Sequence, residues 1–206
     1  DGTENGTIMV KDIYTGTQGS FPNQLAVMGD YIYFSADDGT NGNELWRSNG
    51  TENDTTMVKD INIPGSSNLS NLTIHDGLLY FSAYDVTHGY ELWKSDGSEV
   101  GTTMIKDIFP GSWSSNSNSF TSVGNTLYFS SNDGTNGTEL WKTNGTEEGT
   151  TMVKDIAPEQ SSSPSNFTKI GNLLYFTAND QVHGNELWRS DGTENGTFIV
   201  KDIVPG

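Results

Sequence analysis

Glu44-Leu45-Trp46 is the first of four copies of one tripeptide, followed by Glu91-Leu92-Trp93, Glu139-Leu140-Trp141 and Glu186-Leu187-Trp188. Successive copies lie 47, 48 and 47 residues apart. Each is followed by a turn such as Asp191-Gly192-Thr193 and then by an apolar segment such as residues 57–61. Periods of about 20–50 residues are typical of solenoids, propellers and tandem arrays. Residues needed four times usually serve packing, so the repeat disfavours an enzyme.

Residues 117–156 contain four segments that we interpret as strands. Residues 120–123, 126–130, 139–142 and 151–156 are rich in β-branched and aromatic residues and are separated by Gly/Asn/Asp turns. No segment has the periodicity of an amphipathic helix. Four antiparallel strands in about 47 residues are typical of a propeller blade. The sequence therefore predicts an all-β, β-propeller-like array of four-stranded antiparallel blades, with the repeated Trp side chains packed between blades.

The chain is expected to form one repeat domain over residues 1–206, with blades at about 19–61, 68–108, 116–156 and 165–203. One strand is left over, Ile8-Met9-Val10-Lys11-Asp12-Ile13, which matches the last strand of a blade. Three explanations remain open: an excerpt of a longer repeat array, most of a five-bladed ring, or a strand that pairs with another copy of the chain. We favour the first or the third over a self-sufficient monomer.

Charge and composition argue against several classes of partner. The net charge is −17, and only 10 residues are basic. Nine of these sit at two repeated positions and form no basic groove, which disfavours nucleic acid and anionic membrane surfaces. No apolar run reaches the 18 residues of a membrane-spanning helix, so no membrane insertion is expected. The absence of cysteine excludes a disulfide framework and Cys-based zinc sites.

The Glu of each tripeptide lies 15 residues before a Lys in the next predicted strand, as in Glu44 and Lys59. If the third and fourth strands form a hairpin, these two residues lie opposite each other, and Trp46 lies opposite Met57. Opposite charges across a β-ladder contribute roughly 0.2–1 kcal/mol. The spacing therefore predicts a repeated structural ion pair.

The longest form of the repeat runs from Glu186 to Thr193 and continues with Gly196-Thr197. Over nearly its whole length the chain resembles the bacterial ELWxxDGT-repeat proteins. It departs from their motif at Asn49 and Asn144, where the motif has Asp, and at Ser98, where it has Thr. The resemblance implies a large secreted or surface-attached, hyalin-like repeat protein, and hence an extracellular or cell-surface location. It implies no defined chemistry.

Nine asparagines lie in Asn-x-Ser/Thr sequences and are candidates for N-glycosylation. They are Asn5, Asn49, Asn53, Asn68, Asn71, Asn136, Asn144, Asn166 and Asn195. Several belong to Asn-Gly-Thr turns, where Asn and Gly favour positive φ, so turn formation is the alternative explanation.

Calcium is the one cofactor that the sequence suggests. Asp37, Asp38, Asn132 and Asp133 place hard oxygen ligands beside a glycine turn. They lack the spacing of an EF-hand, and ordinary turn formation is the favoured explanation. His88 and His183 occupy equivalent places on different blades, which disfavours a shared metal site.

Three aromatic residues are candidates for ligand contact: Trp113, Tyr84 and Tyr90. Trp113 lies in a Ser/Asn-rich loop outside the repeat pattern. Loops that join the second strand to the third, and one blade to the next, are expected on one face. Aromatic rings beside amides and carboxylates suit sugars.

Two functions are consistent with these features. The first is a non-enzymatic extracellular structural or adhesive module, N-glycosylated and part of a longer chain or a fibre-like assembly. Its partners would be adjacent repeats or other copies of the chain. The alternative is a carbohydrate-binding, lectin-like β-propeller whose partners are glycans.

Overall fold

The computed structural model describes residues 2–203 and contains sixteen strands in four antiparallel sheets. Blade 1 holds β1 (Asn23–Met28), β2 (Tyr31–Asp37), β3 (Asn43–Ser48) and β4 (Thr56–Lys59). Blade 2 holds β5 (Ser70–His75), β6 (Leu78–Asp85), β7 (Gly89–Ser95) and β8 (Thr103–Lys106). Blade 3 holds β9 (Asn118–Val123), β10 (Thr126–Asn132), β11 (Thr138–Thr143) and β12 (Thr151–Lys154). Blade 4 holds β13 (Ser165–Ile170), β14 (Leu173–Asn179), β15 (Asn185–Ser190) and β16 (Phe198–Lys201).

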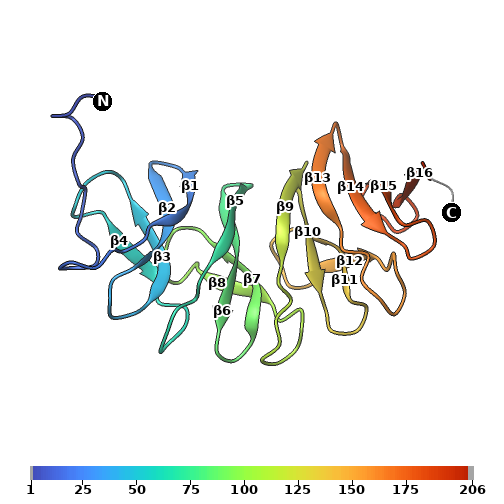
Figure 1. The fold of residues 1–206 in the computed structure, drawn as a ribbon, viewed down its shortest axis with the longest axis horizontal. Helices are drawn as coiled ribbons and strands as arrows, with labels where there is room; N and C mark the ends of the chain where they lie inside the picture. Colours follow the sequence, from blue (N-terminus) through green and yellow to red (C-terminus); the bar gives the residue numbers. More distant parts are fainter. Residues whose placement is uncertain (1, 204–206) are drawn as a thin grey trace.

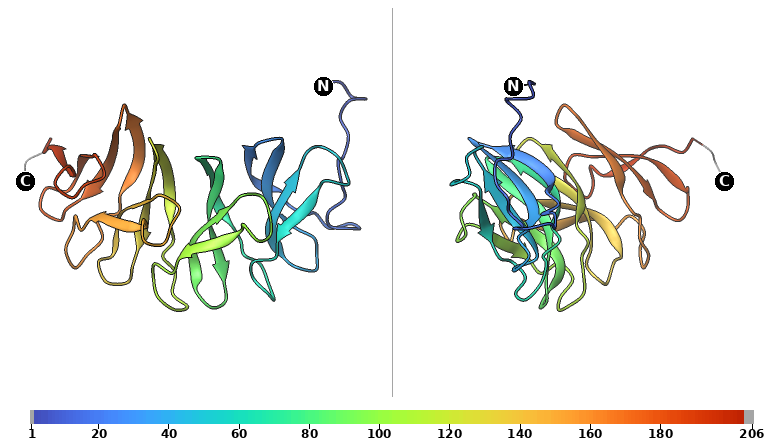
Figure 2. Two further views of the ribbon diagram at one scale, coloured as in Figure 1. Left: turned by 180° about the vertical axis from the view of Figure 1, so that it is seen from behind. Right: turned by 60° about the vertical axis from the view of Figure 1, so that its left-hand side comes forward.

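Each sheet keeps its strands in chain order, and neighbouring sheets meet through their first strands, β1, β5, β9 and β13. These inner strands lie side by side, and the blades follow one another along an open arc (Figure 1). Seen from behind, the two ends of the arc are again far apart (Figure 2). The predicted array of four-stranded antiparallel blades is confirmed. Within residues 2–203 we find no helix with the length and hydropathy needed to cross a membrane.

The hydrophobic core lies in the layers between blades. Between blades 1 and 2, Tyr33 and Leu45 pack against Phe81, Ala83 and Trp93, all less than a tenth exposed. Equivalent residues fill the two other junctions. Burying a large apolar side chain stabilises a fold by roughly 1.5–3 kcal/mol. The expected packing of the repeated Trp side chains between blades is confirmed for Trp93, Trp141 and Trp188, whereas Trp46 packs with residues of its own blade and Ile13.

The predicted ion pair between Glu44 and Lys59 is wrong. Trp46 pairs with Met57 as expected, but a bulge next to Trp46 places Leu45 opposite Lys59. The ammonium groups of Lys106 and Lys154 point instead to the following blade, where they donate to the carbonyls of Thr150 and Thr197, each at 2.9 Å.

The carboxylate of the repeated glutamate instead binds the linker that leads to the next blade. Glu44 is fully buried, and its two oxygens accept the backbone N–H groups of Ile61 (2.9 Å) and Ser67 (2.8 Å). These residues belong to the linker that leads into blade 2. Glu91 and Glu139 bind the next two linkers in the same way. Each buried carboxylate therefore joins one blade to the start of the next.

Burial also makes these carboxyl groups sensitive to pH. Desolvation raises the pKa of Glu44 and Glu91 to about 7, against the lowering effect of the hydrogen bonds that they accept. Between the ordinary pKa of 4.5 and this value, the folded chain holds protons that the unfolded chain has lost. The contribution of these two groups to the free energy of unfolding is therefore fully present below the ordinary pKa and is lost as the pH rises through 7.

Residues 8–13, the left-over segment, belong to no sheet in the described chain. They lie against blade 1, with Ile8 and Met9 74% and 76% exposed and Ile13 packed on the apolar surface of that blade. The strand predicted over residues 8–13 is therefore not formed in the described chain.

We predict that raising the pH from about 5 to 8 lowers the midpoint of thermal unfolding, and that a Glu44→Gln/Glu91→Gln variant shows a smaller decrease. Gln is neutral at both pH values, so two of the titrating groups are removed. Calorimetry over this pH range measures the effect. The control is Glu52→Gln/Glu99→Gln, which removes two charges from exposed turns. An unchanged slope in the Glu44/Glu91 variant would contradict the assignment.

Candidate functional site

The loops of the array gather along one edge, which we call the linker edge. It consists of the loops at residues 38–42, 86–88, 133–137 and 180–184 and of the blade linkers at residues 60–69, 107–117 and 155–164. The first linker is held between blades, since the N–H of Ser67 donates to Asn43 and the N–H of Tyr84 donates to Ser67. These loops run along the lower side of the arc in Figure 1. The expectation that they share one face is confirmed.

The start of every inner strand carries the same unusual backbone. Two non-glycine residues three positions apart have φ between 43° and 61°. They are Phe21 and Gln24, Asn68 and Asn71, Asn116 and Ser119, and Ser163 and Asn166. Such left-handed residues cost roughly 1–3 kcal/mol each and concentrate at functional sites. They coincide with the irregular register of each inner strand, a bulge of the kind that redirects side chains.

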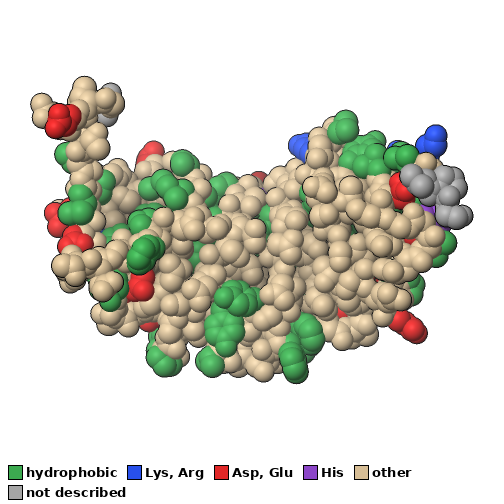
Figure 3. All heavy atoms as spheres, in the orientation of Figure 1, with side chains coloured by type: hydrophobic (Ala, Val, Ile, Leu, Met, Phe, Trp, Pro, Cys, Tyr) green, Lys and Arg blue, Asp and Glu red, His purple; other side chains and the backbone are tan. Residues whose placement is uncertain are grey.

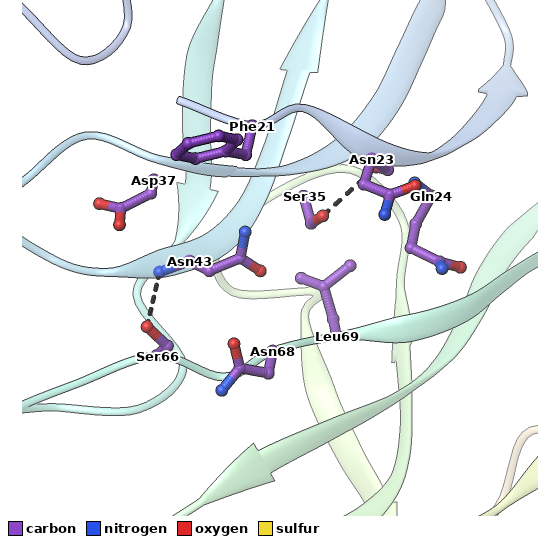
Figure 4. Close-up of a pocket in the computed structure, with 9 residues that line it drawn as sticks. All are labelled: Phe21, Asn23, Gln24, Ser35, Asp37, Asn43, Ser66, Asn68 and Leu69. Carbon is purple, nitrogen blue, oxygen red and sulfur yellow. Dashed lines mark hydrogen bonds between the residues drawn. The ribbon is translucent and has the colours of Figure 1, made fainter. Parts of the chain in front are cut away.

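A cavity of about 410 Å³ opens at this point between blades 1 and 2 (Figure 4). It is lined by Phe21, Asn23, Gln24, Ser35, Asp37, Asn43, Ser66, Asn68 and Leu69. The side-chain amides of Asn43 and Asn68 make no hydrogen bond with any described residue. Asp37 uses one carboxylate oxygen, which accepts the N–H of Gly39 at 2.7 Å. The cavity therefore offers free donors and acceptors beside one aromatic ring.

A second cavity of about 340 Å³ lies one repeat further on, between blades 2 and 3. It is lined by Asn68, Ser70, Asn71, Ser82, Tyr90, Asn116, Ser117 and Asn118. Most of these positions are equivalent to those of the first cavity, with Tyr90 in the place of Asn43. Asn68 lines both, so the two cavities are adjacent. We call them the junction pockets.

The sequence-based candidates included Asn68 and Asn71, as glycosylation sites, Asp37, as a calcium ligand, and Tyr90, as a ligand contact, but missed the other pocket residues. A signal was present: amide and hydroxyl side chains recur at the start of each inner strand, as in Asn23, Ser70 and Asn118. It was hidden because these residue types also form ordinary turns.

The three aromatic candidates lie at one junction but not in one pocket. Tyr84 and Tyr90 pair across neighbouring strands with ring centroids 5.2 Å apart. The hydroxyl of Ser114, next to Trp113, accepts the N–H of Tyr90 at 3.0 Å. The Trp113 ring itself is 67% exposed and stacks on Phe109. In Figure 3, hydrophobic side chains project from this lower side of the molecule.

The calcium candidates are engaged in turns. Asp38 accepts the N–H groups of Thr40 and Asn41 and the side-chain amide of Asn41, and Asp133 makes the same three bonds. The side-chain oxygens of Asp37 and Asn132 each accept a glycine N–H. Within residues 2–203, no three acidic or histidine side chains are placed so that they could hold a metal ion together.

The two histidines lie on different blades and pair with aspartates of their own loops. His88 Nδ1 lies 2.9 Å from Asp85, and His183 Nδ1 lies 2.7 Å from Asp180. The hydrogen bond with Asp180 raises the pKa of His183.

Eight of the nine glycosylation candidates are exposed. The exception is Asn136, which is half-buried and donates its amide to Asp133 at 2.7 Å. Glycosylation at these positions stays a prediction.

No family model and no curated protein matches the chain, so the resemblance to ELWxxDGT-repeat proteins also stays a prediction. Among solved structures, a puromycin hydrolase S511A mutant matches with a TM-score of 0.60 and 16% identity over 91% of this chain. A putative TolB from Agrobacterium tumefaciens matches with a TM-score of 0.50 and 10% identity over 89% of this chain. The chain spans only 30% and 66% of those two proteins. These likenesses establish the propeller-like fold.

The comparison corrects the prediction of a non-enzymatic structural or adhesive module. That prediction took repetition as evidence against an enzyme, yet the same arrangement of blades forms part of a protein named as a hydrolase. The prediction that the chain is not an enzyme is wrong for the same reason. At this level of identity the likeness carries no activity over to the chain.

We predict that Gly89→Ala destabilises the chain more than Gly184→Ala. Both glycines have positive φ and occupy equivalent positions where the third strand of their blades begins. A Cβ at Gly89 would meet the carbonyl of Trp113, whereas one at Gly184 would meet nothing within 4 Å. The two variants share the backbone cost of about 1 kcal/mol, and only the first also displaces the linker. Urea unfolding measures the difference, and equal losses would contradict this linker contact.

Proposed function

We propose that the chain is a carbohydrate-binding β-propeller module whose junction pockets each hold one sugar unit. The observation that supports this most strongly is the recurrence of one polar pocket at two successive junctions. Each has side-chain amides and hydroxyls at equivalent places on the linker edge, and each has one aromatic residue, Phe21 in the first pocket and Tyr90 in the second, at different places.

The chemistry of the pocket walls suits a sugar ring. Asn43, Asn68 and Asp37 supply donors and acceptors for sugar hydroxyls, and Phe21, which is 74% exposed, supplies an apolar surface. Tyr90 takes that role in the second pocket. A net charge of −17 repels acidic glycans, so the expected ligand is neutral or cationic.

The arrangement favours a chain of sugars over a single unit. Because Asn68 lines both pockets, an oligosaccharide that occupies the first pocket can extend directly into the second. Linked contacts raise the overall affinity of weak single sites through effective concentration. The proposed ligand is therefore a neutral oligosaccharide lying along the linker edge.

We predict that Asn43→Ala weakens oligosaccharide binding about five- to tenfold, the loss of roughly 1 kcal/mol for one hydrogen bond to the ligand. A neutral glycan array identifies the ligand, and titration calorimetry measures the affinity. Asn43 donates no side-chain hydrogen bond to the fold, so the unfolding midpoint stays near that of the parent chain. The control is Asn53→Ala, which removes an exposed amide from the turn between β3 and β4. An array without a neutral glycan hit would contradict the proposal.

A further inference from the structure

We propose that blade 4 of one copy packs on blade 1 of a second copy of this chain, with residues 8–13 of the second copy completing the joint blade. The surfaces used are those that join successive blades within one chain. Two arcs joined at both ends contain eight blades, within the four to eight typical of closed propellers. This inference is independent of the proposed sugar site.

The outer face of blade 4 exposes residues that are buried everywhere else. Leu187 is 39% exposed, whereas its equivalents Leu45, Leu92 and Leu140 are fully buried. Ile203 is 67% exposed, whereas Ile61, Ile108 and Ile156 are at most 9% exposed. In blades 1 to 3 the next blade covers these positions. Figure 3 shows hydrophobic side chains at both ends of the arc.

The polar contacts of a blade junction are also unmade at this end. Arg47 donates to the carbonyl of Gly97 in the next blade at 2.9 Å, and Lys94 and Lys142 donate to Gly145 and Gly192. Arg189 is the equivalent cation of blade 4, and its buried Nε has no partner among the described residues.

The matching acceptor is found at the other end of the arc. Gly50 of blade 1 is equivalent to Gly97, Gly145 and Gly192, each of which lies against a tyrosine hydroxyl of the preceding blade. Nothing lies within 4 Å of the Cβ position at Gly50. Docking blade 4 on blade 1 would give Arg189 the Gly50 carbonyl and place Tyr175 beside it.

Blade 1 offers an apolar groove to receive these side chains. It has a volume of about 240 Å³, and its walls include Val10, Ile13, Leu25, Ile32 and Phe34. At the inner junctions the Tyr and Leu of the preceding blade, such as Tyr33 and Leu45, fill the equivalent layer. Tyr175 and Leu187 of a second copy have the same types and positions.

Residues 11–14 already mark where the preceding blade sits. Lys11 donates to the carbonyl of Thr55 at 2.8 Å, as Lys106 does to Thr150 at 2.9 Å. Ile13 packs with Phe34 and Trp46 as Ile108 packs with Phe129 and Trp141. Residues 11–14 therefore occupy the position that the end of the outer strand of a preceding blade occupies at the other junctions.

A docked copy would bring its own outer strand, β16, to the same place, so one of the two segments must leave. Residues 191–203 repeat residues 1–13 with two differences, Phe198 for Ile8 and Ile199 for Met9. Exchange of such similar segments has a small net cost, as in domain swapping. Residues 8–13 keep their contacts with blade 1 and pair with β15 of the other copy, while its β16 is released.

Light scattering on the 206-residue chain as it elutes from a sizing column tests the docking. At about 0.15 M salt, where repulsion between the two acidic chains is screened beyond about 8 Å, the expected mass is twice the 22.4 kDa of one chain. Leu187→Glu is expected to restore the single-chain mass. Val100→Glu adds the same charge at an 89%-exposed turn and is expected to keep the doubled mass. A single-chain mass for the parent protein at all concentrations overturns the proposal.

Cysteine cross-linking tests the exchange, because the chain has no cysteine of its own. Phe198 pairs with Arg189, so the equivalent Ile8 is expected to pair with Arg189 of the other copy. Mixing an Ile8→Cys chain with an Arg189→Cys chain should give a disulfide-linked dimer on oxidation. An Arg47→Cys partner, inside the array, should not cross-link. A doubled mass without the disulfide overturns the exchange.

Discussion

The buried carboxylate of each Glu-Leu-Trp tripeptide is the constraint on which the array depends. Glu44 lies at the start of β3 and accepts two backbone N–H groups of the linker to blade 2. A linker this close to two sheets has few other partners for its N–H groups, and a buried unpaired N–H costs roughly 1–3 kcal/mol. The carboxylate therefore fixes where the next blade begins. Because Glu91 and Glu139 do the same, one repeated interaction sets the geometry of every junction.

That geometry determines where function can arise. Holding each linker against the preceding blade leaves space between the linker and the inner strand of that blade, where the left-handed residues of the bulge lie. The apolar layer below is built from the same Tyr, Leu, Phe and Trp positions at each junction, whereas the pocket walls differ more. Asn43, Tyr90 and Thr138 occupy one equivalent position and give the junctions different side chains on the same frame.

The repetition was informative about packing and misleading about function. A tripeptide present four times is structural, as the buried Trp and Glu side chains show. A repeated structural tripeptide does not exclude a functional site. The repeated blades present their loops at one edge, and a site can form from those loops whose sequences are not repeated. A similar arrangement of blades forms part of a protein named as a hydrolase. The glutamate was misassigned for a related reason: a spacing of 15 residues fits a flat hairpin, and the bulge beside Trp46 shifts that register.

The sequence by itself determined the blade. The period, the strand segments, the turns and the pairing of Trp46 with Met57 follow from local residue preferences and alternation, which act over a few residues. Tertiary structure decided the partner of Glu44, the course of the lysines to the next blade and the walls of the junction pockets. These depend on groups more than 15 residues apart that meet only when blades pack, and on a bulge whose left-handed residues have no distinctive composition. The exposed surfaces at the two ends of the arc are also decided by tertiary structure. Leu187 occupies the same position as Leu45 but is exposed because no described blade covers it.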